Sequence, residues 1–177
     1  MILQKIKIKK IMYATDLSEN ALYAFSYAVS LANLYNAGIT ILHVLAEDHK
    51  LDDKIIGYVS SSQWEKIKRR HEDDARDALI GKAGGRAFVG DVLDQFCADA
   101  QKDFEEQKFD INEIMVTRGH PVEQIIAQAK EKDIDLIVMG THGSGTLADA
   151  MLGSTARRVL RRATIPVFVI RLPEDSR

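Results

Sequence analysis

The sequence predicts a single-domain α/β fold, in which a doubly wound, five-stranded parallel sheet carries helices on both faces. Short apolar runs alternate along the chain with longer amphipathic segments, and this alternation is the pattern of an open parallel sheet. The 177 residues suit one domain, and no internal repeat, low-complexity tract or Pro/Ser-rich linker divides them. We therefore expect residues 1–177 to form one domain.

Five short apolar runs define the expected strands. They cover residues 11–14, 39–44, 113–117, 134–139 and 166–170. The run at 39–44 is rich in β-branched residues and almost entirely apolar, as expected of a strand that helices cover on both faces.

Capping and turn residues place the helices that accompany these strands. The first helix begins at Glu19, where Asp16 or Ser18 can cap the free N–H groups. It ends at a left-handed cap within residues 36–38. The helices that flank the fourth strand cover residues 122–131, which Pro121 introduces at a favourable first position, and residues 156–162.

Two amphipathic helices are expected between the second and third strands. Apolar side chains at helical spacing mark each of them. They are Trp64, Ile67, His71, Ala75 and Leu79 in a helix that ends at residues 81–85, and Phe88, Val92, Phe96, Ala100 and Phe104 in the next. These apolar stripes need a partner surface. Packing on the sheet is one answer, and a partner-binding hairpin or a lid over the cleft is another.

Composition and charge exclude several classes of protein. The net charge of −2 provides no overall field to recruit nucleic acid or acidic lipid, so neither is an expected partner. The opening segment alternates Ile with Lys, unlike a signal peptide, and no apolar run approaches the ~20 residues that span a bilayer. Cys97 is the only cysteine, which excludes an internal disulfide and a thiolate zinc cage. A reduced, cytoplasmic location is therefore expected.

A glycine-rich stretch, GTHGSGTLADAMLGST at residues 140–155, directly follows the fourth apolar run. In an open parallel sheet, ligands bind beyond the carboxyl ends of the strands, where the strand order reverses. Two loops are therefore candidates for the site. One is this stretch, and the other is the loop after the first strand, which carries Ala14, Thr15 and Asp16.

Three glycines of the stretch, Gly140, Gly143 and Gly153, permit tight turns and leave backbone N–H groups uncovered. Gly153, Ser154 and Thr155 immediately precede a helix, and free N–H groups at the positive end of a helix form an anion site. Phosphate is the expected anion. The stretch is not a P-loop, because it has no GxxxxGK[ST] motif, and the first strand carries no GxGxxG. Turns and a helix cap without any ligand are the alternative interpretation.

The spacing Gly140-x2-Gly143-x9-Gly153-Ser154 resembles G-x2-G-x9-G-[S/T], the nucleotide motif of the ATP-binding branch of the universal stress protein family. Further motifs occur in the same order as in that family. They are the first strand with its Asp at residues 10–18, the second strand at 42–44, the G-x-P turn at 119–121 and the closing strand at 164–171. The resemblance covers the whole chain except roughly residues 48–107, the expected helical insertion.

The resemblance implies a sheet of order 3-2-1-4-5 that binds ATP across the switch between strands one and four. By similarity, Asp16 and Val44 would hold the adenine, Val44 through its backbone. Gly140 would lie near the ribose with Met139 beside it, and Thr15 would line the same cleft. The phosphates would be held by Gly143, Gly153, Ser154 and Thr155. Relatives pair through the last strand, which implies a homodimer through residues 166–170.

The chain departs from the family in two places. The arginine that often follows the second glycine of the motif is absent, because Gly143 precedes Ser144-Gly145-Thr146. Asp149 lies within the loop and would repel phosphate, so either Mg²⁺ or Mn²⁺ bridges the two or Asp149 points to solvent. Relatives usually place one helix between the second and third strands, whereas residues 61–107 are expected to hold two.

The residues favour binding over catalysis. The stretch has no Walker lysine, and the row Arg157, Arg158, Arg161 and Arg162 is typical of a solvated helix face. His142 could act as an acid or base, although a loop histidine is the simpler interpretation. We predict an ATP-binding regulatory protein of the stress response, with at most slow hydrolysis or phosphorylation of Ser154, as the resemblance allows. A ligand-free dimeric interaction module is the alternative. An ATP-pyrophosphatase or nucleotidylyl-transferase is disfavoured, because SGGxDS and HxGH are absent near the first strand.

Overall fold

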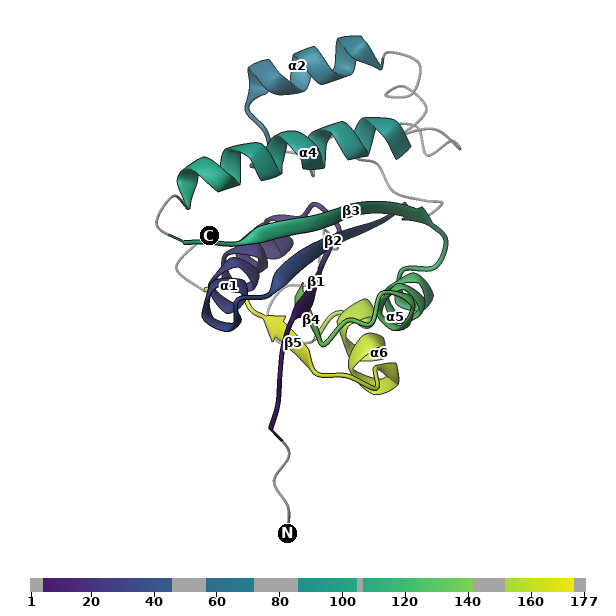
Figure 1. The fold of residues 1–177 in the computed structure, drawn as a ribbon. Coiled ribbons are helices and arrows are strands. Elements are labelled where there is room, and N and C mark those ends of the chain that lie inside the picture. The colour runs from purple at the N-terminus through teal and green to yellow at the C-terminus, as the bar shows by residue number, and fades with distance from the viewer. Residues whose placement is uncertain (1–4, 46–56, 72–85, 105–106, 142–151, 174–177) are drawn as a thin grey trace.

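The chain forms a five-stranded parallel sheet in the order β3-β2-β1-β4-β5 (Figure 1). The computed structural model describes residues 5–45, 57–71, 86–104, 107–141 and 152–173. The strands are β1 (Lys10–Thr15), β2 (Gly38–Leu45), β3 (Asp110–Arg118), β4 (Leu136–Gly140) and β5 (Val167–Ile170). The helices are α1 (Glu19–Tyr35), α2 (Ser61–Arg70), α4 (Arg86–Asp103), α5 (Pro121–Glu131) and α6 (Ser154–Arg162). The predicted fold class, and the strand order that the family resemblance implied, are confirmed.

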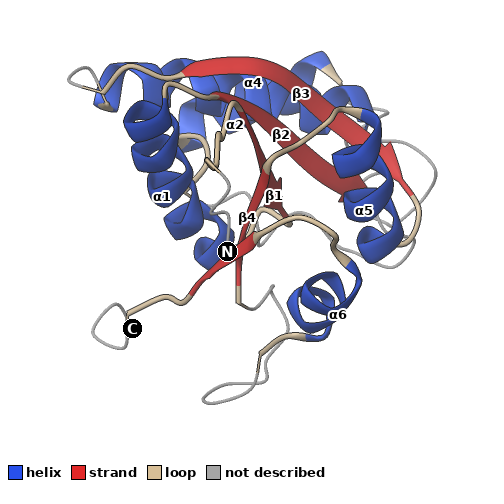
Figure 2. Cartoon of the chain, turned by 60° about the horizontal axis from the view of Figure 1, so that its bottom comes forward, coloured by secondary structure: helices blue, strands red, loops and turns tan. Residues whose placement is uncertain are grey.

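Helices cover both faces of the sheet (Figure 2). On the face of α1 and α4, an apolar cluster includes Tyr13, Phe25 and Phe96. On the face of α5 and α6, a second cluster includes Met12 and Ile137. Successive residues of β1 therefore alternate between two cores, and every residue of this central strand after Lys10 is buried. Among the described residues, no helix combines the length and the apolarity needed to cross a membrane.

Helix α1 begins and ends at its predicted caps. The Ser18 backbone is extended, with φ −78° and ψ 161°, and its Oγ accepts a hydrogen bond from the Ala21 amide at 3.2 Å. Asn36 follows the helix in the left-handed conformation, with φ 51° and ψ 49°. Asparagine tolerates this conformation better than most residues, which explains why the helix ends there.

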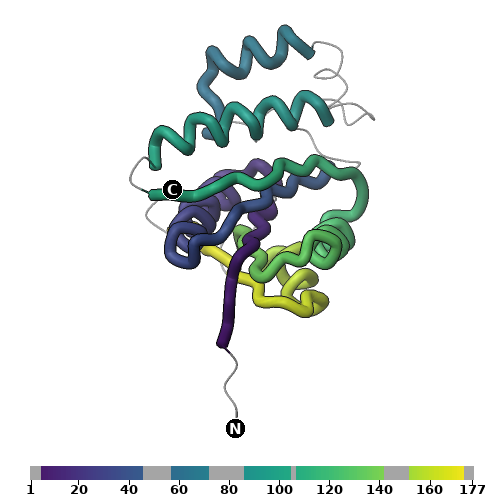
Figure 3. Tube along the Cα trace, in the orientation of Figure 1, coloured from purple at the N-terminus to yellow at the C-terminus, as the bar shows by residue number. Residues whose placement is uncertain are grey.

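Of the two helices in the insertion, only α4 packs on the sheet, whereas α2 lies outside it as a further layer (Figure 3). Helix α4 buries two neighbouring rows of side chains, so it can contact the sheet and α2 at once. Helix α2 buries only Ile67 and places the ring of Trp64 5.1 Å from that of Phe88 on α4. The expectation that both helices pack on the sheet is therefore wrong for α2.

Several element boundaries differ from those expected, among them the start of β3, which lies at Asp110 and not at residue 113. Helix α2 ends at Arg70 instead of continuing to residues 81–85, because His71 leaves the helical conformation and its Nε2 lies 2.9 Å from Asp91 Oδ2 on α4. Ala75 and Leu79 lie outside the described residues. Strand β4 begins at Leu136 and not at residue 134, because the Asp135 carboxylate accepts from the Lys9 and Lys10 amides at 2.7 and 3.0 Å. Tertiary contacts decide the latter two boundaries, and apolar periodicity does not reveal them.

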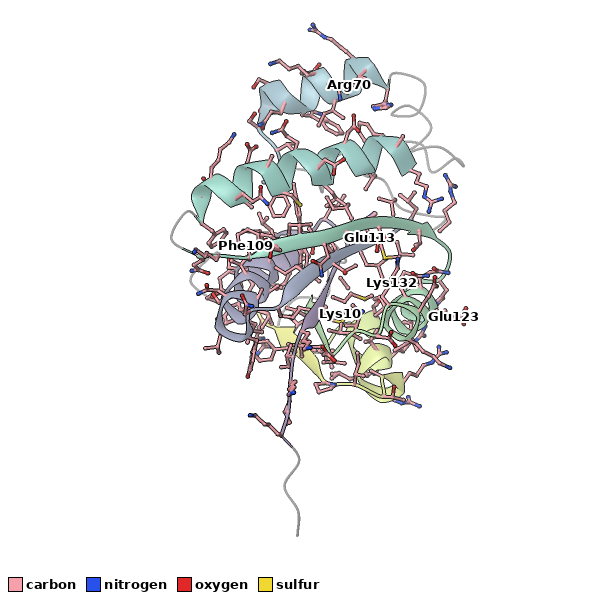
Figure 4. The ribbon with its side chains drawn as sticks, viewed as in Figure 1. Lys10, Arg70, Phe109, Glu113, Glu123 and Lys132 are labelled. Carbon is pink, nitrogen blue, oxygen red and sulfur yellow. The ribbon has the colours of Figure 1, made fainter. Side chains whose placement is uncertain are left out.

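Charged side chains join the strands near the amino end of the sheet (Figure 4). Lys10 Nζ donates to the Lys132 carbonyl at 2.9 Å, and Lys132 Nζ lies 2.7 Å from Glu113 Oε2. The hydrogen bond that the Lys132 ammonium donates to the Glu113 carboxylate raises the pKa of Lys132. These contacts tie β1, β3 and the end of α5 together at the end of the sheet opposite the expected site.

Candidate functional site

The loop after β1 and the end of β4 meet at the point where the strand order reverses. Ala14 of β1 pairs with Met139 of β4, and both are buried. On the other side of β1, Thr15 pairs with His43 of β2. Asp16 follows directly and is half-buried. Three predicted site residues, Ala14, Asp16 and Met139, therefore gather at the edge where open parallel sheets bind ligands.

The loop between β1 and α1 has a strained backbone conformation, which hydrogen bonds to the loop's own side chains stabilise. Leu17 is buried and has φ 65°, a left-handed conformation that costs a non-glycine residue about 1–2 kcal/mol. Asp16 Oδ1 accepts from the Ser18 amide at 3.1 Å, and Ser18 in turn caps α1. Strain of this kind persists only where surrounding bonds over-determine the backbone. The loop therefore presents Asp16 in a defined position at the start of α1.

Thr15 does not line the cleft, contrary to what the resemblance implied. Its Oγ1 lies 2.8 Å from the Tyr58 hydroxyl and accepts from the Leu17 amide at 3.0 Å. Because side chains alternate along a strand, Thr15 points to the face of α1 and α4, away from the face of Ala14. His43 Nδ1 lies 2.9 Å from the Thr15 carbonyl, which can only accept, so His43 carries a proton on Nδ1. Thr15 therefore supports the loop from within the core.

The N-terminus of α6 is fixed beside the end of β4. Gly153 is the N-cap, and as a glycine it has no side chain with which to cap the helix. The Gly153 amide donates to the Thr141 carbonyl at 2.9 Å, and the Thr141 amide donates to Ile170 at 2.8 Å. The expectation that Gly153 leaves its amide uncovered is therefore wrong. The amides of Ser154 and Thr155 open the helix, where no preceding turn supplies acceptors, and they are the donors that an anion would meet.

Gly140 marks a close approach between β4 and the first turn of α1. A Cβ added at this position would lie 3.1 Å from the carbonyl carbon and oxygen of Asn20 and 3.3 Å from the Ala21 nitrogen. These are backbone atoms of a packed helix and cannot move away cheaply. A larger residue here would have to displace the first turn of α1 by a few tenths of an ångström, a constraint that the sequence motif does not reveal. The expected place of Gly140 near a ribose stays a prediction.

Val44 and Thr117 are neighbours at the same edge of the sheet. They pair across β2 and β3, and Val44 is half-buried on the face of α5. The Oγ1 of Thr117 is buried and has no hydrogen-bond partner in the part of the chain that the structure describes. Leaving a buried hydroxyl unpaired costs about 1–3 kcal/mol, so this atom is a candidate contact for a ligand. No sequence motif marks Thr117 as a candidate site residue, because only its pairing with Val44 across β2 and β3 places it at this edge.

Several predicted residues lie outside the part of the chain that the structure describes. They are Gly143, His142 and Asp149, so the phosphate, acid–base and metal roles considered for them stay predictions. In the described ranges, no group of three His, Cys, Asp or Glu residues could hold a metal ion. The four arginines of α6 are exposed, as expected of a solvated helix face.

Comparison with known proteins agrees with the resemblance. Residues 7–171 match the model of the universal stress protein family. The chain is 27% identical over 167 residues to universal stress protein MJ0577 of Methanocaldococcus jannaschii, which covers 94% of this chain and 96% of that protein.

Solved structures with the same fold include two universal stress proteins. UspA from Lactobacillus plantarum has a TM-score of 0.64 at 23% identity, over 94% of this chain and 100% of that one. A universal stress protein in complex with cAMP has a TM-score of 0.54 at 21% identity, over 94% and 98% of the two chains. Because the family model spans nearly the whole sequence, the chain belongs to the universal stress protein family.

Proposed function

We propose that this protein binds an adenine nucleotide, ATP, at the carboxyl edge of the sheet and acts as a regulatory protein of the stress response. The observation that carries the proposal is the N-terminus of α6, where the N-cap Gly153 has no side chain and its hydrogen bond to Thr141 holds the helix beside β4. Such a terminus attracts phosphate, and it lies next to the switch point where nucleotides bind in this class of sheet. The structural relative in complex with cAMP supports an adenine nucleotide.

The adenine, the ribose and the phosphates of the nucleotide are each assigned to a separate group of residues. The adenine lies between Asp16 and the backbone of Val44, where the unpaired Thr117 hydroxyl offers a further hydrogen bond to the base. The ribose lies at Gly140 beside Met139. The phosphates meet the amides and hydroxyls of Ser154 and Thr155, together with Gly143 and Gly153. A divalent cation at Asp149 is part of the proposal only if ATP affinity depends on Mg²⁺ or Mn²⁺.

We propose binding with slow turnover at most. The donors assigned to the phosphates are amides and hydroxyls, which hold charge without activating a nucleophile. Ser154 is exposed at the start of α6, so its hydroxyl is placed to accept a phosphoryl group from bound ATP. We also propose a reduced, cytoplasmic setting, in which the buried Cys97 stays a thiol because burial raises its pKa to about 12.

Replacing Ser154 with proline tests the amide directly. Proline has no N–H group, yet it fits the first position of a helix, and Gly153 already has φ −54° and ψ 153°, which suits a residue before proline. The variant should keep α6 intact while it loses both the amide and the hydroxyl that Ser154 offers to phosphate. We expect ATP affinity, measured by calorimetry, to fall about tenfold, whereas Ser154→Ala, which loses only the hydroxyl, should cost about threefold or less.

Ser61 provides a matched control for this substitution. It is the first residue of α2, and the preceding Ser60 has φ −68° and ψ 158°, so Ser61→Pro removes the corresponding amide from a helix of the outer layer. This variant should bind ATP as the parent does. Equal ATP affinity in Ser154→Pro and Ser61→Pro would rule out phosphate binding at α6.

We further propose that two copies of the chain pair through residues 166–170. Strand β5 lies at the edge of the sheet, and Phe168 is 41% exposed on it, with its ring 6.1 Å from that of Tyr27. Pairing would cover this apolar edge. Light scattering at micromolar concentration should give the mass of a dimer, and Phe168→Asp should shift it toward the monomer. A monomeric parent protein would refute this contact.

A further inference from the structure

A chain of buried hydroxyl groups connects the insertion between β2 and β3 to the loop that carries Asp16. Tyr58, which precedes α2, is 2% exposed and lies beneath this loop. Its hydroxyl is 2.9 Å from that of Tyr13 and 2.8 Å from Thr15 Oγ1. At the two ends of this row of hydroxyl groups, the Tyr13 hydroxyl donates to the Ala21 carbonyl at 2.6 Å, and Thr15 Oγ1 accepts from the Leu17 amide at 3.0 Å.

The direction of every hydrogen bond in this chain is fixed. The Ala21 carbonyl only accepts, so the single proton of Tyr13 points to it, and Tyr13 must accept from Tyr58. The proton of Tyr58 is then used, so Tyr58 accepts from Thr15. Thr15 in turn accepts from the Leu17 amide. Burial raises the pKa of Tyr13 and of Tyr58, which keeps both phenols protonated at physiological pH.

This chain of hydrogen-bonded hydroxyl groups holds the strained part of the loop. Leu17 has the left-handed backbone, and its amide bonds to Thr15 Oγ1. The same Oγ1 that accepts from the Leu17 amide also reaches the Tyr58 hydroxyl, so one orientation of Thr15 makes both bonds. Without Tyr58, Thr15 would have a buried proton with no acceptor, and its hydroxyl would be drawn to other partners. The position of Asp16, between Thr15 and Leu17, therefore depends on Tyr58.

We propose that Tyr58 is a positioning residue of the nucleotide site, which holds the loop from Thr15 to Ser18 in the conformation that presents Asp16 to the base. The inference rests on the proposed function. It assigns a role in binding to the insertion, the part of the chain that the family motifs do not cover. Because linkage is reciprocal, a ligand that fixes Asp16 also fixes the segment around Tyr58.

The test removes single hydroxyl groups and measures ATP affinity by calorimetry on the full-length protein. Tyr58→Phe should weaken ATP binding about tenfold, because the loop no longer has one favoured conformation. Tyr23→Phe is the matched control, since it removes a tyrosine hydroxyl that, among the described residues, hydrogen-bonds only to Tyr27, at 3.5 Å on the exposed side of α1. It should bind ATP as the parent does.

Variants of Thr15 separate a positioning role from a general loss of stability. Thr15→Val should weaken binding at least as much as Tyr58→Phe, and Thr15→Ser, which keeps the hydroxyl, should restore it. In the Thr15→Val background, the further change Tyr58→Phe should have little effect on affinity, because its partner is already gone. Independent, multiplying effects of the two changes would overturn the proposal.

Hydrogen exchange provides a readout that needs no nucleotide. In Tyr58→Phe, the Leu17 amide should exchange more than about tenfold faster than in Tyr23→Phe, while amides of β4 stay unchanged. If the parent binds ATP and Tyr58→Phe binds it within twofold as well, the positioning role is refuted and the proposed function stands. If the parent does not bind ATP, both fail, and exchange at Leu17 shows separately whether Tyr58 holds the loop.

Discussion

Replacing Gly140 with valine should lower the free energy of unfolding by about 3 kcal/mol, as measured by urea denaturation. The new Cβ would lie 3.1 Å from backbone atoms of Asn20, and the two methyl groups of valine would crowd the first turn of α1 further. Overpacking against backbone cannot be relieved by a change of rotamer. Gly140→Ala should be intermediate, with a cost of about 1–2 kcal/mol.

Gly38 is the control for this prediction, because it is also a half-buried glycine at the end of a strand. The three atoms nearest to a Cβ at Gly38 all belong to the side chain of Asn112, which is exposed and can rotate away. Gly38→Ala should change stability by about 0.5 kcal/mol or less. Similar losses for Gly140→Val and Gly38→Ala would show that β4 and α1 do not approach each other as described.

Replacing Phe25 with alanine should cost about 3–5 kcal/mol of unfolding free energy, the largest effect that we expect from one substitution. Phe25 is 2% exposed, and its ring lies 5.2 Å from Tyr13 on β1 and 4.8 Å from Phe96 on α4. It also contacts the rings of Phe104 and Phe109. The substitution would leave a cavity where α1, the sheet and the insertion meet.

Leu34 on the same helix provides the comparison, because it is 72% exposed. Leu34→Ala should change the unfolding free energy by about 0.5 kcal/mol or less. A loss of less than about 1 kcal/mol for Phe25→Ala would mean that the insertion does not share a core with α1.

The sequence predicts the fold because local signals and the global pattern agree. Apolar runs mark all five strands, Ser18 and Asn36 bound α1, and Pro121 opens α5. The strand order came from the family resemblance and not from the residues themselves. Where local signals are weak, the boundaries are wrong, as at the end of α2.

The sequence predicts where the candidate site lies in the fold, but it does not predict which contacts the individual side chains make there. The motif spacing predicts that Asp16, Met139 and Ser154 lie at one edge of the sheet, because the carboxyl ends of parallel strands all lie at that edge. Motif spacing does not reveal where a side chain points, so Thr15 was placed in the cleft although it faces the core. Tyr58 and Thr117 were missed, because their roles depend on contacts between segments far apart in the sequence.

Titration of the protein with ATP, followed by the amide signals of its nuclear magnetic resonance spectrum, tests the central claim most directly. We expect the signals of Asp16, Val44, Ser154 and Thr155 to shift together and to saturate with one dissociation constant. Signals near Glu113, at the opposite end of the sheet, should stay in place. No change at millimolar ATP, or shifts that leave the start of α6 untouched, would contradict a nucleotide site at this edge.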